Sequence, residues 1–208
     1  MCQCREVIGH AAAKVVPSRA DERRATIRRA AVQEFLTHGH AATSMAKIAA
    51  SAGVSRPALY QYFSDKDDVF ASAFASVFEV RTSEALAALR SAGTVPDALD
   101  ALLQRYEGDL WKLVARSKHF DEIVAAKSSR VTAAVAIEVD RFWGEVARWL
   151  ATIYPGGSLI QVRRRDDWLS VLRWAPQGLR VDRPSVSDYR RRLATLARGV
   201  AADVESVG

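Results

Sequence analysis

The stretch that most restricts the fold is AGVSRPALYQYF, residues 52–63. Within it, Gly53, Ser55 and Pro57 follow one another inside sequence whose apolar residues recur at helical spacing. Gly53 permits the positive φ that a sharp turn requires. Ser55 can cap a helix, and Pro57 then lies in the first turn, where its missing N–H costs nothing. The stretch therefore predicts a tight bend between two short helices.

Apolar residues recur three and four positions apart along almost the whole chain, which is the period of an α-helix. The pattern predicts a helix from Asp21 that Gly39 ends, a short helix capped by Thr43, and a long helix capped by Ser64. Further helices are predicted after residue 96, over about 120–126 and 131–153, up to about 178, and over 186–204. No stretch alternates as a strand does, so the expected fold is all-α.

The composition is that of a folded protein without a membrane anchor. Of the 208 residues, 49% are hydrophobic and 26% are charged, and no apolar run approaches the roughly 18 residues of a membrane span. The first residues carry no apolar stretch of the secretory type. Cys2 and Cys4 are the only cysteines, and two thiolates supply only half of the usual four zinc ligands. We therefore expect a cytoplasmic protein with no metal and no cofactor, in which the two cysteines lie in a flexible tail.

The positive charge is concentrated near the N-terminus. The formal net charge is +6, and residues 1–66 hold ten Lys and Arg against five Asp and Glu. The remaining 142 residues are almost balanced, with 20 basic and 19 acidic side chains. Charge gathered at one end predicts a polyanionic partner for that end, although a solvated basic face is the commoner reason for such a segment.

A helix, a turn containing glycine and a second helix are typical of the DNA-binding helix-turn-helix, whose second helix enters the major groove. The first helix is expected to be small and apolar on its inner face, at Ala46, Ala49 and Ala50. The expected DNA-binding residues have hydroxyl, basic or long polar side chains that can reach phosphates or base edges; they are Thr43, Ser44, Ser55, Arg56, Tyr60, Gln61, Tyr62 and Lys66.

The run TSMAKIAASAGVSRPALYQYFSDKDDVF, residues 43–70, follows a spaced Ala31, Phe35 and Gly39. Together these residues resemble the TetR family of bacterial transcriptional regulators over roughly residues 20–75. Within the family's pattern, Lys47 stands where acidic residues are frequent, and Val69 replaces a common leucine. His40 replaces a usual aromatic residue, so the corner after the first helix is expected to pack less tightly.

The resemblance implies an all-helical homodimer that binds double-stranded operator DNA. We expect a flexible arm over residues 1–18, a three-helix DNA-binding domain over 19–65, and a helical bundle for ligand binding and dimerisation over 66–208. In this family the middle helices enclose a mostly apolar cavity. The bulky aromatic residues expected to line it are Tyr106, Trp111, Phe120, Phe142, Trp143 and Trp149, with plain core packing as the alternative for each.

The last two helices are expected to dimerise through apolar residues, namely Leu169, Leu172, Leu193, Leu196 and Val200. Two arginine runs, 163–165 and 190–192, are interpreted as solvated surface because acidic residues lie next to them. His119 is expected at the surface, with a role in orienting a ligand as the alternative.

The sequence thus predicts a repressor that a small, mostly apolar ligand releases from its operator by changing the spacing of two recognition helices. A TetR-like protein that recruits a protein partner instead of sensing a ligand is the alternative. No nucleophile elbow, zinc-protease motif, P-loop or dinucleotide-binding glycine pattern is present in the sequence, so an enzyme is not expected.

Overall fold

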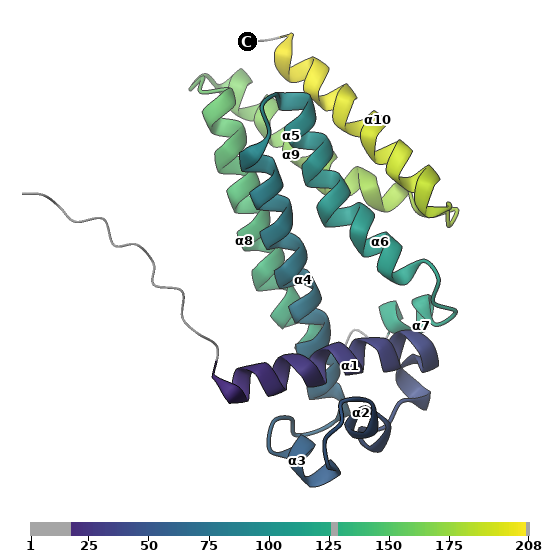
Figure 1. Ribbon diagram of the computed structural model, residues 1–208. Coiled ribbons are helices and arrows are strands. Elements are labelled where there is room, and N and C mark those ends of the chain that lie inside the picture. The colour runs from purple at the N-terminus through teal and green to yellow at the C-terminus, as the bar shows by residue number, and fades with distance from the viewer. Residues whose placement is uncertain (1–17, 126–128, 207–208) are drawn as a thin grey trace, which may run out of the picture.

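The computed structural model describes residues 18–125 and 129–206, and every regular element within these ranges is a helix (Figure 1). The all-α prediction is confirmed. The elements are α1 (Arg19–Ala42), α2 (Met45–Ser51), α3 (Arg56–Tyr60), α4 (Lys66–Ser91), α5 (Val95–Leu103), the π-helical turn η1 (Gln104–Gly108), α6 (Asp109–Val114), α7 (Phe120–Ala125), α8 (Ser129–Ile153), α9 (Leu159–Gly178) and α10 (Val186–Glu205). Cys2 and Cys4 lie outside the described residues.

The N-terminal helices and the start of α4 share one hydrophobic core. Figure 1 shows α1 lying across the lower end of α4, with α2 and α3 beneath it. The core residues are Ile27, Ala31 and Phe35 of α1, Ile48 and Ala49 of α2, Leu59 of α3, and Val69, Phe70 and Phe74 of α4. Burial of these side chains fixes α2 and α3 against the longer helices.

The predicted end of the first helix at Gly39 is confirmed. The backbone leaves the helical conformation there, with φ 77° and ψ 169°, and one further turn follows before Thr43. An L-residue with a side chain rarely adopts this φ, so glycine is required by the backbone alone.

Two predicted helix caps are wrong by one residue. Ser44, not Thr43, caps α2, because the Ser44 hydroxyl accepts from the Lys47 N–H at 3.3 Å. Asp65, not Ser64, caps α4, because the Asp65 carboxylate accepts from the Asp68 N–H at 2.7 Å. In both cases a shorter or more acidic side chain one position later reaches the free N–H groups of the first turn.

The inner face of α2 also differs from its prediction. Ala49 is buried as expected, whereas Ala46 and Ala50 are exposed to solvent. The buried side chains of this helix are Met45, Ile48 and Ala49. A seven-residue helix makes fewer than two full turns, so its apolar residues are too few to predict which side of the helix faces the core.

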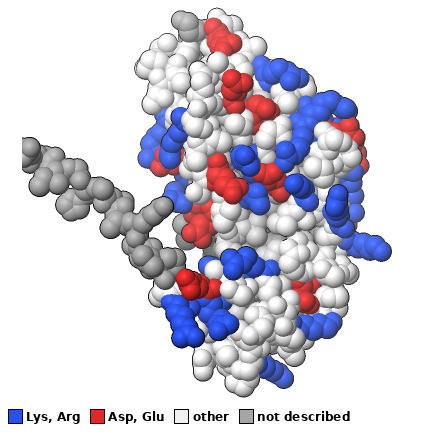
Figure 2. Space-filling model, in the orientation of Figure 1, with Lys and Arg blue, Asp and Glu red and all other residues white. Residues whose placement is uncertain are grey.

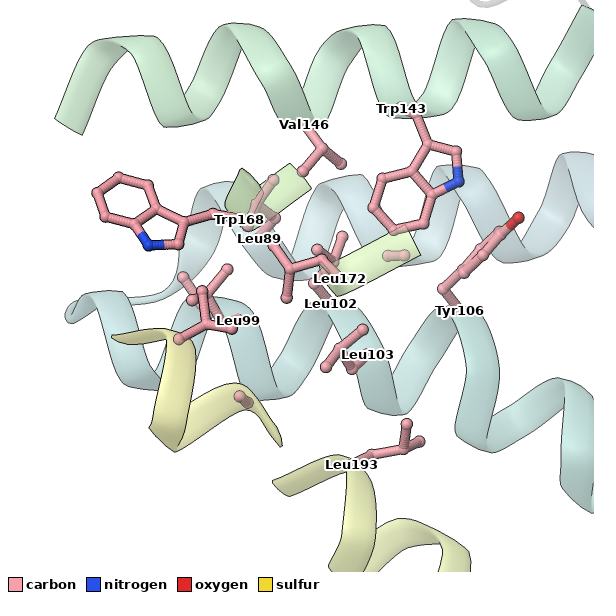
Figure 3. Packing of buried hydrophobic residues seen from close by; sticks show 14 of the residues in the cluster. Leu89, Leu99, Leu102, Leu103, Tyr106, Trp143, Val146, Trp168, Leu172 and Leu193 are labelled. Carbon is pink, nitrogen blue, oxygen red and sulfur yellow. The ribbon is translucent and has the colours of Figure 1, made fainter. Parts of the chain in front are cut away.

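A second core fills the body formed by α5, η1, α6, α8, α9 and α10 with the far half of α4. Figure 3 shows residues of this core coming together from several helices, with the ring of Trp143 facing Tyr106. Leu172 and Leu193 are fully buried in it. Their predicted role in dimerisation is therefore wrong, because a side chain enclosed by its own chain has no surface to offer a second copy.

A π-helical turn was not predicted. The sequence predicts an ordinary helix after residue 96, but η1 widens the helix over Gln104–Gly108. Each such turn contains an extra residue, so the helix face shifts after it. As a result Glu107 is buried, and Leu110 only half-buried.

The two cores are linked by α4 and α7. The N-terminal core continues past residue 65 into α4 as far as Phe74, and the body core takes Ala85 and Leu89 from the same helix. Ile123 of α7 lies in the N-terminal core, whereas Phe120 of the same helix packs against the body core. Among the described residues, no helix is long and apolar enough to cross a bilayer.

Candidate nucleic-acid interface

The predicted bend between α2 and α3 is present. Gly53 has φ 64°, and the Ser55 hydroxyl accepts from the Ala58 N–H at 3.2 Å to begin α3. Pro57 lies in the first turn of α3, and Leu59 turns into the N-terminal core with no exposed surface. This arrangement holds α3 against α2 on one side and leaves its other side open.

The open side of α3 presents polar and basic side chains. Arg56, Tyr60 and Gln61 are exposed, and Tyr60 keeps 45% of its surface accessible. The Arg56 guanidinium carbon lies 5.8 Å from the centre of the Tyr60 ring, so the two side chains form one cation–π pair. Ser44 and Ser55 are also exposed, each at the N-terminal end of a helix.

Two of the expected DNA-binding side chains form hydrogen bonds within the protein. The Thr43 hydroxyl is buried and donates to the Gly39 carbonyl at 2.7 Å. The Lys66 ammonium is partly buried and donates to the His40 carbonyl at 2.8 Å. These contacts hold the corner between α1 and α2, and a phosphate would have to compete with them.

Arg24 is a candidate that the sequence pattern did not identify. Its guanidinium carbon lies 5.9 Å from the centre of the half-buried Tyr62 ring, which places a basic residue of α1 beside the end of α3. Figure 2 shows Lys and Arg side chains near the N-terminal part of α1 and at the lower end of the molecule. Helical spacing predicts that Arg24 is exposed, but its stacking on Tyr62 depends on the angle between α1 and α3.

His40 packs more closely than the sequence comparison with the family suggested. Its ring stacks on Phe35 at 5.7 Å between centres and meets the Phe70 ring edge-on at 4.9 Å. The imidazole is an aromatic ring, so it fills the position that a larger aromatic residue would take. Lys47 donates to the Ala42 carbonyl at 2.9 Å and remains exposed at the same corner.

Residues 27–73 match the family described as bacterial regulatory proteins of the tetR family. The matched segment contains the whole bend and the start of α4. This N-terminal segment is therefore a TetR-family domain.

The TetR-family fold extends over the rest of the chain. A TetR-family regulator from Mesorhizobium loti is 19% identical, with a TM-score of 0.67 over 89% of this chain and 98% of that chain. One from Streptomyces coelicolor is 22% identical, with a TM-score of 0.63 over 91% of both chains. FadR from Bacillus subtilis, in complex with stearoyl-CoA, is 14% identical, with a TM-score of 0.61 over 85% and 97%. No curated protein matches the chain in sequence.

Most of the aromatic residues expected to bind a ligand are packed against other aromatic rings in the body. The Tyr106 and Phe142 rings stack with centres 4.3 Å apart, and the Trp143 ring lies edge-on to both. Trp111 is buried, and its indole N–H donates to the Pro184 carbonyl at 3.1 Å. Phe120 and Trp149 are half-buried at the edge of this core.

A buried polar cluster lies next to these aromatic rings. The Glu107 carboxylate accepts from the Arg180 guanidinium and from the Tyr189 hydroxyl, both at 3.1 Å. Burial raises the pKa of Glu107, and the arginine and the hydroxyl only partly offset this effect. Burial likewise raises the pKa of Tyr189. The cluster joins η1, the segment after α9, and α10.

A groove of about 610 Å³ lies between α9 and α10. Its apolar lining includes Val171, Leu179, Leu196 and Val200, and none of the six expected ligand-binding aromatics. Leu196 is half-buried, as is Leu169 on α9. Trp174, three residues after Val171 on α9, is 57% exposed. This face of the bundle therefore presents apolar side chains that its own chain leaves uncovered.

The remaining polar predictions fall at the body surface. Arg191 is exposed and pairs with Asp188, whereas the half-buried Arg190 and Arg192 pair with Asp109 and Asp182, so only Arg191 lies on the open surface. His119 is partly buried and faces Glu122. Among the residues that the structure describes, no three His, Cys, Asp or Glu side chains come together as a metal site.

Proposed function

We propose that the protein is a transcriptional repressor that binds operator DNA as a homodimer and is released by a small, mostly apolar ligand. The observation that carries this proposal is the outward face of α3, where Arg56 and Tyr60 are held open to solvent by the Gly53 bend. A short helix with a polar, basic outer face fits the major groove.

The DNA-contacting surface extends to both sides of α3. We expect the exposed Gln61 and Arg56 to read base edges, and the exposed Ser44 and Ser55, at helix N-termini, to contact phosphates. Arg24 adds a positive charge beside Tyr62. Thr43 and Lys66 support this surface indirectly. Their side chains donate hydrogen bonds to the Gly39 and His40 carbonyls and so fix the backbone between α1 and α2.

Dimerisation is assigned to the α9 and α10 face. The half-buried Leu169 and Leu196, with Val200 at the groove, fit a partner surface that is itself apolar. A second copy on this face gives two α3 helices, which must lie about 34–36 Å apart, or a multiple of it, to enter successive major grooves.

The proposed effector is an apolar or aromatic molecule that enters the body between its aromatic side chains. Tyr106, Trp111, Phe120, Phe142, Trp143 and Trp149 remain the candidates for contact, because they lie together in the body core. The fold relative FadR from Bacillus subtilis, which forms a complex with stearoyl-CoA, favours a ligand with a long apolar part. Release requires that the ligand bind one spacing of the α3 helices more tightly than the other.

Selection of DNA from a pool of random duplexes by the full-length protein tests this function. We expect one recurring sequence with two-fold symmetry, and we expect Arg56→Ala to weaken its binding by about 1–3 kcal/mol, roughly 5- to 150-fold. Arg148→Ala is the matched control. Arg148 is an exposed arginine of α8, outside the DNA-binding domain, and it forms an ion pair with Glu145. Failure to enrich any sequence would contradict a regulatory function.

A further inference from the structure

The corner between α1 and α2 is held by a contact from the C-terminal body. Glu122 of α7 accepts a hydrogen bond from the Ala41 backbone N–H at 2.6 Å, across 81 residues of sequence. The other oxygen of the same carboxylate lies 3.2 Å from His119 Nδ1. Glu122 therefore contacts the turn before its own helix through one oxygen and the DNA-binding domain through the other.

Gly39 gives this carboxylate the space it occupies. A Cβ atom at position 39 would lie 2.2 Å from Glu122 Oε2 and 2.8 Å from His119 Nδ1, so a side chain there and the observed contact exclude each other. The positive φ of Gly39 also interrupts the helical backbone of α1 two residues before the Ala41 N–H. The missing side chain and the positive φ of Gly39 thus both allow the contact between Glu122 and Ala41.

Further contacts place α7 and the turn before it firmly on α1. The Ser117 hydroxyl donates to the Leu36 carbonyl at 2.7 Å, and Ile123 is buried in the N-terminal core. Figure 1 shows α7 beside the end of α1, where the chain turns toward α2. Because the Leu36 and Ala41 contacts lie on either side of Gly39, they restrain both its position and its orientation.

The same corner is held from the opposite side by α4. Lys66 donates to the His40 carbonyl, and His40 Nε2 lies 2.9 Å from the Asp67 carboxylate. Residues 39–41 are thus contacted from one side by the first turn of α4, next to the α4 residues of the N-terminal core, and from the other side by α7. A change in the separation of these two elements must be absorbed at this corner.

We propose that Glu122 is a positioning residue that sets the orientation of the DNA-binding domain on the C-terminal body through the Ala41 N–H. This inference rests on the proposed function, in which the ligand-free protein is the form that binds DNA. The contact joins α7 to the backbone of the DNA-binding domain, so it favours the domain orientation that the structure shows. An effector that moves α6 and α7 would break it and release the domain.

The chemistry of the contact fits this role. The hydrogen bond from the Ala41 N–H lowers the pKa of Glu122, with a further contribution from His119, so the carboxylate is ionised at neutral pH. A hydrogen bond to an ionised acceptor is stronger than one between neutral groups. Glu122 is still partly exposed, so the contact can open without unfolding either core.

The test compares full-length Glu122→Ala, Glu122→Gln and Asp121→Ala for binding to the duplex that the wild-type protein selects. We expect Glu122→Ala to bind about three- to tenfold more weakly, whereas the glutamine retains a carbonyl acceptor for Ala41 and stays within about twofold. Asp121 is the matched control, because it lies in the same turn of α7 but pairs with Arg183 of the body.

Two further measurements separate positioning from general stability. Hydrogen exchange at the Ala41 amide should be faster in Glu122→Ala than in the wild type, while the melting temperature stays close to that of Asp121→Ala. Gly39→Ala should lower the melting temperature less in the Glu122→Ala background than in the wild type, because the closest clash, with the Glu122 carboxylate, is then absent and only the contact with His119 and the strain of the positive φ remain.

The outcomes distinguish the two proposals. If no duplex is selected, the proposed function fails, and the exchange and Gly39→Ala measurements still test the contact. If a duplex is selected and Glu122→Ala binds it as tightly as the wild type, or more tightly, the positioning role of Glu122 is overturned.

Discussion

Gly53 is the residue whose change should affect the DNA-reading site most directly. Nothing lies within 4 Å of the position that its Cβ would take, so substitution adds only the strain of φ 64°. We expect Gly53→Ala to lower the free energy of unfolding by about 1–2 kcal/mol. Thermal unfolding followed by circular dichroism measures this change.

Gly93→Ala provides the control for that measurement. Gly93 also has open space around it, but its φ is not positive. Alanine there should leave the free energy of unfolding within about 0.5 kcal/mol of the wild type. Equal effects of the two substitutions would contradict the requirement for glycine at the bend.

Residues with special backbone or capping roles were predictable only in part. Gly39, Gly53 and Ser55 were placed correctly, because positive φ and N-terminal capping each restrict the residue type strongly. The caps of α2 and α4 were misplaced, since Thr43-Ser44 and Ser64-Asp65 each offer two adjacent capping residues. Which of the two is used depends on where the chain enters the helix, and that is set by tertiary packing.

At the scale of elements, η1 brings a carboxyl group into the core between α9 and α10. Burial raises the pKa of Glu107 above its ordinary value of 4.5, so the folded protein holds a proton at a pH where the unfolded chain has released it. The stability that Glu107 contributes is therefore greatest below that value and falls as the pH rises toward the higher folded pKa.

The corresponding prediction concerns Glu107→Gln. The amide does not titrate, so the fall in melting temperature that begins just above pH 4.5 should be weaker in this variant. The Tyr189 hydroxyl lowers the pKa of Glu107, so Tyr189→Phe should raise that pKa further. The fall in melting temperature should then extend to higher pH in this variant. Identical pH profiles for all three proteins would show that Glu107 does not contribute to the pH dependence.

The long helices could be predicted from apolar spacing, whereas the π-helical turn could not. Apolar spacing predicts which residues face inward only on a regular helix. The π-helical turn η1 interrupts the regular helix, and no glycine or proline at its start indicates this in the sequence. Leu172 and Leu193 illustrate a second limit. An apolar residue on the inner stripe of a terminal helix can face its own bundle or a partner, and the sequence pattern is the same for both.

At the scale of the whole molecule, the α9 and α10 face should decide the oligomeric state. We expect Leu196→Glu to weaken the dimer by about 3 kcal/mol, more than a hundredfold, because a carboxylate would have to leave water to face an apolar partner. Sedimentation velocity measures the mass directly. Val80→Glu, on an exposed apolar position of α4, is the control and should leave the mass unchanged.

The continuity of α4 has a mechanical consequence. Its 26 residues form a rod roughly 39 Å long, anchored in the DNA-binding domain at one end and in the body at the other. As a lever arm of that length, it converts an angular displacement of about 5° into a movement of about 3 Å at its tip. With two such arms in a dimer, a few degrees of rotation would carry the recognition helices out of register with the grooves.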